Sequence, residues 1–190
     1  MTKQYAICIC MIVFVATLTV NGASTRSTSS TTKTMLEKIR SVNSKKITIL
    51  LKKEQNSAMI NNRLGYLYYA IGKYRNSEFH YKKAIQYNSK NIEARLGLYL
   101  LSMANKDYSK AAAYCREVRS IDNLNYYGNL YYTYARMAQY KYQSAETTCK
   151  KMLTVYPCDT TFLRLLKLNY TYQKQTKKAQ KVQSDIELLR

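Results

Sequence analysis

The stretch that decides the fold runs from Leu64 to Ala84 and has the sequence LGYLYYAIGKYRNSEFHYKKA. A step of 34 residues carries its aromatic, apolar and small positions onto residues of similar kind further along the chain. The positions related in this way are Leu64, Leu98, Tyr132 and Leu166; Tyr74, Tyr108 and Tyr142; Ser77, Ala111, Ala145 and Ala179; and Ala84, Val118, Met152 and Ile186. Self-similarity at a fixed period of this length indicates a repeat architecture, in which each unit packs on its neighbours.

The pattern within one unit resembles the tetratricopeptide repeat, in which an aromatic-x-x-Leu-Gly-x-x-Tyr half precedes an Ala-x-x-x-Phe-x-x-Ala half. The matching residues are Leu64, Gly65 and Tyr68 in the first half and Ser77, Tyr81 and Ala84 in the second. Pro157 stands where that repeat usually has its terminal proline. The resemblance covers Ala58 to Arg190 and implies pairs of antiparallel helices.

The predicted fold is therefore all-α, a right-handed α-solenoid of four helix-turn-helix repeats at residues 58–91, 92–125, 126–159 and 160–190. Composition agrees, because one Pro and five Gly in 190 residues are too few for the turns of a β-sandwich or barrel. Apolar residues make up 46% of the chain, enough for a core of ordinary size. The last helix has one apolar stripe, which is typical of a terminal unit that closes a stack.

The N-terminus has the profile of a signal peptide. Lys3 precedes an apolar run from Tyr5 to Val20, and small residues follow it. Residues 1–22 are predicted to be a leader cleaved after Gly22, with cleavage after Ala23 as the alternative. An uncleaved membrane anchor is the rival interpretation, although the run is shorter than the ~20 residues that span a bilayer.

Two segments are expected between the leader and the repeats. Residues 23–33 are rich in Ser and Thr and are predicted to be a flexible linker. Thr34 and Glu37 form a capping box at the start of an apolar-periodic stretch. Residues 34–57 are therefore predicted to be one or two helices that cap the first repeat.

Catalytic, cofactor and metal-binding patterns are absent from the sequence. The single histidine, His80, lies between Phe79 and Tyr81 on a predicted helix, where a packing role is the expected one. There is no nucleophile elbow, phosphate-binding loop or zinc-type cysteine pair. We therefore expect no enzyme activity, no cofactor and no metal site.

Three cysteines lie beyond the leader. Cys115 and Cys149 occupy equivalent positions one repeat apart, too distant for a disulfide, and are predicted to be buried small hydrophobic residues. Cys158 lies in a predicted loop beside Pro157 and is the candidate for pairing with another chain.

The family resemblance implies a concave groove, lined by the first helix of each pair, that holds a segment of a partner protein. The predicted contact residues are large and mostly Tyr, Leu or Met: Tyr66, Tyr69, Leu100, Met103, Tyr127, Leu130, Tyr134, Met137 and Tyr172. Such anchors suit a hydrophobic or amphipathic segment. Two alternatives are that the chain's own N-terminal segment fills the groove and that several of these residues belong to the core.

Some members of the family bind a chaperone's C-terminal carboxylate through Lys, Asn and Arg on this surface. The matching positions here carry Asn62, Tyr66, Leu100, Tyr127 and Tyr131. The sequence therefore predicts no chaperone-tail binding.

The charge balance gives a second hypothesis. The chain has 31 Lys and Arg against 11 Asp and Glu, a formal net charge of +20. Basic residues recur on the predicted second helices, at Lys82, Lys83, Lys150, Lys151, Lys177, Lys178 and Lys181. They are candidates for contact with an acidic protein surface, an anionic polymer, lipid head groups or nucleic acid, the last of these not expected for an exported chain. The alternative is a merely solvated basic face.

Taken together, the sequence predicts an exported, periplasmic or envelope-associated protein that binds other proteins as a scaffold or adaptor subunit. The alternative class is a basic-surface binder of an anionic polymer, lipid head group or nucleic acid.

Overall fold

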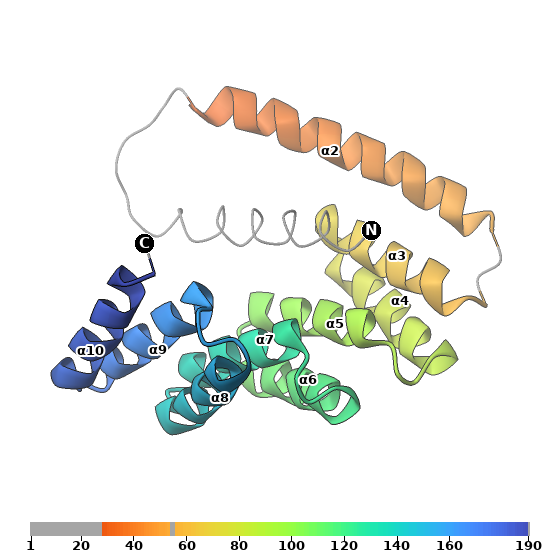
Figure 1. Cartoon of the computed structure of the whole chain (residues 1–190). Helices are drawn as coiled ribbons and strands as arrows, with labels where there is room; N and C mark the ends of the chain where they lie inside the picture. The colour runs from red at the N-terminus through yellow and green to blue at the C-terminus, as the bar shows by residue number, and fades with distance from the viewer. Residues whose placement is uncertain (1–27, 54–55, 190) are drawn as a thin grey trace. The chain divides into compact units, whose positions relative to one another are not determined.

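The computed structural model describes residues 28–53 and 56–189, and the predicted leader lies outside these residues (Figure 1). The chain divides into two compact units, residues 1–39 and 40–190. The described part consists of helices joined by turns and contains no strand, which confirms the predicted all-α solenoid. Its helices are α2 (Thr28–Leu51), α3 (Ala58–Ala70), α4 (Tyr74–Tyr87), α5 (Ile92–Ala104), α6 (Tyr108–Ile121), α7 (Tyr126–Ala138), α8 (Tyr142–Val155), α9 (Thr160–Tyr172) and α10 (Thr176–Glu187).

The helices of the second unit start at the 34-residue step of the sequence pattern. First helices begin at Ala58, Ile92, Tyr126 and Thr160, and second helices at Tyr74, Tyr108, Tyr142 and Thr176. Each helix from α3 to α10 packs against the next one in the chain. The units therefore stack in sequence order, as the repeat pattern requires.

Local chemistry at both ends of the first helices explains this regularity. A polar side chain caps each N-terminus by accepting a backbone N–H: Ser57 for α3, Asn91 for α5, Asn125 for α7 and Asp159 for α9. A residue in the left-handed backbone region then follows each helix, namely Gly72, Lys106, Tyr140 and Lys174. These four positions are also one repeat apart, so the same tight turn leads into each second helix.

Small residues let the helices of neighbouring pairs approach closely. The ring of Tyr81 lies against Gly65 and Gly97, where an added Cβ would collide with it. Cys115 and Cys149 are fully buried beside Ala111 and Ala145, which confirms that they are small core residues. Cys158 is exposed.

The helix before the repeats starts earlier than the sequence predicted. The capping box placed the start at Thr34, but α2 begins at Thr28, so residues 28–33 of the predicted linker are helical. Extending an existing helix forms one hydrogen bond per residue, whereas Ser and Thr oppose it by only a few tenths of a kcal/mol each. The placement of the start at Thr34 was therefore wrong.

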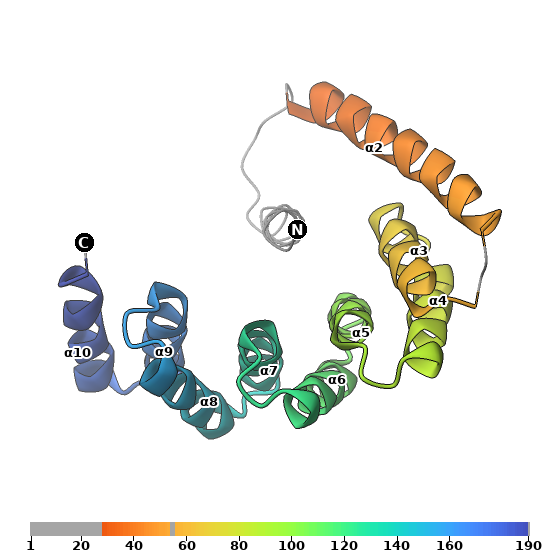
Figure 2. The same ribbon diagram turned by 45° about the vertical axis from the view of Figure 1, so that its right-hand side comes forward.

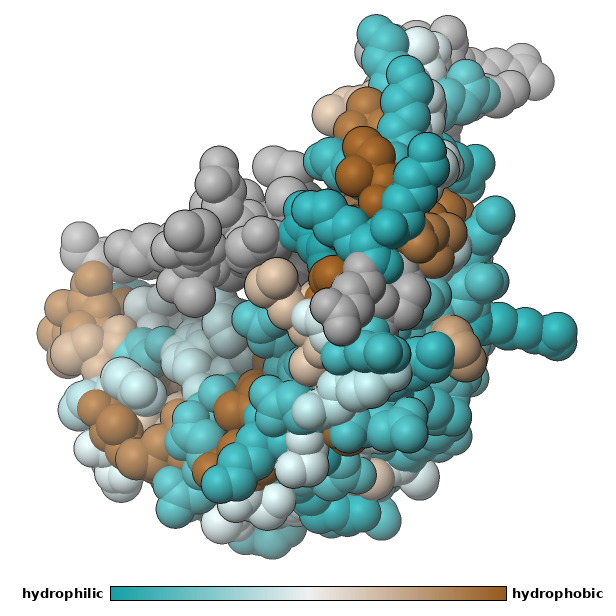
Figure 3. Space-filling model, turned by 90° about the vertical axis from the view of Figure 1, so that its right-hand side faces the viewer, coloured by the Kyte–Doolittle hydropathy of each residue, from teal (hydrophilic) through white to brown (hydrophobic). Residues whose placement is uncertain are grey.

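The end of α2 packs against the first repeat. Ile47 is buried in a cluster with Leu64, Leu67 and Tyr68, and Leu50 packs against the same cluster. Other apolar side chains along α2 are exposed, among them Val42, Ile49 and Leu51, and brown apolar residues are visible on the face of the molecule drawn in Figure 3. No helix within the described residues is both long and apolar enough to cross a bilayer.

Candidate functional site

The helices of the repeats form two rows. Figure 2 shows α3, α5, α7 and α9 on one side of the stack and α4, α6 and α8 on the other. Within the first row, α3 contacts α5 and α5 contacts α7. We call α3, α5, α7 and α9 the first-helix row, and α4, α6, α8 and α10 the second-helix row.

The predicted groove residues all lie on the first-helix row, but their accessibility differs. Tyr127, Tyr134 and Tyr172 are exposed, the last by 55%. Tyr66, Tyr69, Leu100 and Met103 are half-buried and pack against core clusters. Met59 and Leu168, on α3 and α9, add further exposed apolar surface to the row.

Leu130 and Met137 are corrections to the predicted groove. Both are buried, in the same core cluster as Phe162, Leu163 and Leu166 of α9. Their side chains therefore contribute to the packing between successive repeats. The sequence alternative, that some of these residues belong to the core, holds for this pair.

Aromatic rings join the middle of the first-helix row. The rings of Tyr99 and Tyr131 stack with their centroids 4.6 Å apart and nearly parallel. Tyr127 lies 5.9 Å from Tyr131 and 5.4 Å from Tyr126. Such contacts hold the rings in place, so the surface around the exposed Tyr127 is ordered before any ligand binds.

The predicted basic residues on the second-helix row differ in how they are engaged. Lys82 and Lys150 form ion pairs with Glu78 and Glu146, and Lys151 donates to the backbone oxygen of Asn123. Lys83 lies over the ring of Phe79 and Lys178 over that of Tyr170, whereas Lys177 and Lys181 are exposed on α10. Pairing within the chain reduces the charge that Lys82 and Lys150 offer to a ligand.

Three sets of helices, each joining one first helix to two second helices, occupy equivalent places in the repeats. In each set one first helix packs against the second helices before and after it. We call these sets the α4–α5–α6, α6–α7–α8 and α8–α9–α10 junctions.

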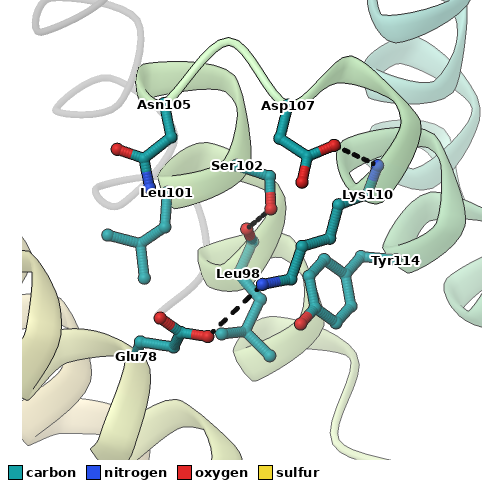
Figure 4. A pocket seen from close by; sticks show the side chains of 8 residues that line it. All are labelled: Glu78, Leu98, Leu101, Ser102, Asn105, Asp107, Lys110 and Tyr114. Carbon is teal, nitrogen blue, oxygen red and sulfur yellow. Dashed lines mark hydrogen bonds and ion pairs between the residues drawn. The ribbon is translucent and has the colours of Figure 1, made fainter.

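The α4–α5–α6 junction contains a shallow pocket of about 60 Å³, shown in Figure 4. Glu78 of α4 lies 2.8 Å from the ammonium of Lys82 and 3.5 Å from that of Lys110 on α6. The hydrogen bond from Lys82 holds the pKa of Glu78 below its ordinary value. A carboxylate of the chain thus already neutralises the cations of this junction.

The α8–α9–α10 junction repeats this arrangement. Glu146 of α8 is buried, lies 2.7 Å from the ammonium of Lys150, and accepts a 3.1 Å hydrogen bond from the hydroxyl of Tyr170 on α9. Burial acts to raise the pKa of Glu146, but the hydrogen bonds from Lys150 and Tyr170 outweigh it, so the pKa is lowered. Burial and the neighbouring Glu146 raise the pKa of Tyr170.

The α6–α7–α8 junction has a different composition. The guanidinium carbons of Arg119 and Arg136 lie 4.2 and 5.5 Å from the ring centroid of Tyr132 on α7. Burial acts to raise the pKa of Tyr132, but Ser144 together with Arg136, Arg119 and Arg116 lowers it overall. Sequence reasoning did not identify this cluster. A comparison of Glu78, Ala112 and Glu146, each one repeat apart, could have found it.

His80 occupies a packing position. Its ring is buried, stacks on Tyr68 with centroids 5.3 Å apart, and places Nδ1 2.9 Å from Oδ1 of Asn61. Burial and then the charge of Lys83 lower its pKa, which favours the neutral ring. Across the part of the chain that the structure describes, no cluster of His, Cys, Asp and Glu could hold a metal ion.

Paired antiparallel helices repeated every 34 residues define the tetratricopeptide-repeat fold, and the chain is an α-solenoid of that class. The structure of MamA RS-1, a double mutant, superimposes with a TM-score of 0.69 at 12% identity over 82% of this chain and 93% of that one. The Arabidopsis OM64 TPR domain gives 0.56 at 18% identity, over 62% of this chain and 98% of that one.

A third structure is the first TPR of Spaghetti (RPAP3), bound to the HSP90 peptide SRMEEVD. It gives a TM-score of 0.58 at 16% identity over 64% of this chain and 99% of that one. No protein-family model and no curated protein matches the sequence. The predicted resemblance is thus confirmed at the level of the fold.

Proposed function

We propose that the chain is a protein-interaction module that binds a hydrophobic or amphipathic segment of a partner protein on the first-helix row. The observation that carries this proposal is the exposure of large apolar and aromatic side chains on three of the row's helices. They are Met59, Tyr127, Tyr134, Leu168 and Tyr172. Tyrosines of this kind offer a large contact area together with a polar hydroxyl, which makes them frequent anchors of binding energy.

The partner class differs from that of the chaperone-binding TPR domains. The RPAP3 structures hold HSP90 and HSP70 peptides that end in EEVD. In this chain Glu93 lies on the first-helix row, 2.6 Å from the amide nitrogen of Asn62. A carboxylate there would repel an acidic C-terminal tail, so we propose no binding of chaperone tails.

We further propose that the module is exported and acts as a scaffold or adaptor subunit of an envelope assembly in the periplasm. Support for this comes from the leader profile of residues 1–22 alone. We assign no reaction to the protein, and binding of a partner segment as proposed here requires no cofactor.

The test is affinity purification of the tagged full chain from fractionated cells at two salt concentrations. A Tyr134→Ala and Tyr172→Ala double variant should lose a partner that the wild type keeps at the higher salt concentration. Phe79→Ala, which removes an exposed ring from α4, is the matched control and should keep that partner. The mass of the purified chain tests leader cleavage separately.

Two outcomes would contradict the proposal. One is a partner lost equally in the Phe79→Ala control, which would place binding outside the first-helix row. The other is recovery of polyanions alone, released by salt, which would favour binding through the basic surface instead.

A further inference from the structure

The three junctions can be compared residue by residue because they are related by the 34-residue step. The acidic position is Glu78 in the first junction, Ala112 in the second and Glu146 in the third. The neighbouring basic position one helical turn later is Lys82, Arg116 and Lys150. The middle junction therefore retains the cation and lacks the carboxylate.

The middle junction also gains positive charge at positions that are neutral in the other two. Arg119 replaces Ile85 and Leu153, and Arg136 replaces Ser102 and Tyr170. Within residues 34–53 and 56–189, no carboxylate forms an ion pair with Arg116, Arg119 or Arg136. The nearest acidic residue in sequence, Glu117, pairs with Arg95 at 2.8 Å.

The donor groups of this junction converge. Nε of Arg136 donates to Oγ of Ser144 on α8 at 3.1 Å, and the hydroxyl of Tyr132 lies 3.4 Å from the same oxygen. The Arg119 guanidinium is the closer of the two to the Tyr132 ring, and its Nε is buried without a hydrogen-bond partner in the part of the chain that the structure describes. A buried, unpaired donor on a charged group is costly, so a ligand that supplies an acceptor is favoured.

We infer that the α6–α7–α8 junction is a binding site for a doubly charged tetrahedral oxyanion, the phosphate or sulfate group. Such a group has the charge and the number of acceptor oxygens to engage two guanidinium groups and two hydroxyls together. A single carboxylate would neutralise only one of the three arginines. The site combines residues of α6, α7 and α8, and it shares no residue with the partner surface proposed on the first-helix row.

A simpler explanation accounts for part of the cluster. Arg119 and Arg136 lie in the last turns of α6 and α7, where a cation interacts favourably with the helix dipole. That effect requires neither arginine to point at the other helix. It therefore does not explain why both converge on Tyr132 or why Arg116 lies within the same positive potential.

The test is calorimetric titration of the full chain with inorganic phosphate and with sulfate at low ionic strength. Arg119→Gln with Arg136→Gln should weaken phosphate binding at least about tenfold, the scale of one or two charge-assisted hydrogen bonds. The matched control, Arg75→Gln with Arg164→Gln, removes the same charge from exposed positions on α4 and α9. The control should change the affinity by less than about threefold, because exposed charges act through screened, long-range interactions.

A second measurement needs no variant to fold. The Nε–H resonances of Arg119 and Arg136 in the wild type should shift on addition of phosphate, while those of Arg75 and Arg164 should not. Equal loss of affinity in the two double variants, or uniform shifts across all four arginines, would overturn the site in favour of diffuse attraction to a +20 chain. Absence of any phosphate or sulfate binding would overturn it outright.

The source of the group is settled by parallel titrations with free phosphate and with phosphoserine. Comparable affinities would mean that the site recognises the oxyanion alone. Much tighter binding of phosphoserine, lost in the Arg119→Gln and Arg136→Gln variant, would mean that the junction takes the group attached to a larger ligand.

Discussion

The α6–α7–α8 and α8–α9–α10 junctions are built from equivalent helices of the repeat, but their charged residues differ. In the α8–α9–α10 junction, Glu146 neutralises Lys150, and burial together with Glu146 raises the pKa of Tyr170. In the α6–α7–α8 junction, Ala112 replaces the glutamate, and Ser144 together with three arginines outweighs burial and lowers the pKa of Tyr132. The comparison indicates that one junction of a repeat stack can form a distinct site when only a few side chains differ. The helices keep their places because the residues that repeat along the chain determine how they pack.

The largest effect expected from this comparison is on stability. Glu146→Ala leaves the buried Tyr170 hydroxyl without its acceptor, which should lower the free energy of unfolding by about 1–3 kcal/mol. Glu78→Ala is the matched change at the α4–α5–α6 junction, where the ion pairs are largely solvent-exposed. It should cost less than about 1 kcal/mol. Denaturant unfolding of both variants measures the difference, and equal losses would show that burial does not distinguish the two junctions.

The same glutamate should contribute to acid unfolding. Because folding lowers its pKa, Glu146 stabilises the protein above the ordinary carboxyl pKa of about 4.5, and this contribution is lost as the pH falls through the folded-state pKa. Glu146→Gln should therefore flatten the loss of stability between about pH 5 and pH 3 relative to the wild type. The pKa of His80 is also lowered by folding, so below its ordinary value of 6.5 this residue destabilises the wild type and the Glu146→Gln variant equally. Its contribution therefore cancels when the two pH profiles are compared. Parallel pH profiles would contradict the prediction.

Tyr132 and Tyr170 should titrate on opposite sides of the ordinary tyrosine pKa, Tyr132 below it and Tyr170 above it. Ultraviolet absorbance titration of Tyr132→Phe should show the loss of an early component, because the pKa of Tyr132 is lowered. Tyr170→Phe should instead remove a late one, since burial and Glu146 raise its pKa. Arg119→Gln should move the early component to higher pH, because it removes one of the positive charges that stabilise the phenolate. An unchanged early component would show that the arginines do not set the potential at Tyr132.

Much of the fold could be predicted because helix starts depend on local, periodic signals. The polar caps at Ser57, Asn91, Asn125 and Asp159 and the packing of small residues such as Ala111 repeat with the sequence pattern. The start of α2 was missed because a capping box at Thr34 is equally compatible with a helix interior.

The surfaces were harder to predict than the helices. Met137 has the same register as the half-buried groove positions Tyr69 and Met103, but Leu130 and Met137 are buried in one cluster with the large side chains of α9, above all Phe162. Whether such a position is exposed depends on the side chains of the neighbouring repeat. The position of a residue within its own repeat gives no information about those side chains. The arginine cluster was missed for a related reason: its residues come from three helices and are spread over residues 116–144, so no short motif contains them.

The smallest predicted effect concerns the hydroxyl at the centre of the α6–α7–α8 junction. Ser144 replaces the lysines found at the equivalent positions 110 and 178, and its Oγ accepts the hydrogen bond from Arg136. Ser144→Ala should lower the free energy of unfolding by about 0.5–1 kcal/mol, since a half-buried donor loses its partner. It should also raise the pKa of Tyr132, because the contact with Ser144 lowers that pKa.

The matched control is Thr147→Ala, which removes an exposed hydroxyl from the same helix and should change neither the stability nor the pKa of Tyr132. If the two variants behave alike, Ser144 does not orient Arg136, and the pKa of Tyr132 is lowered by the three arginines without help from α8.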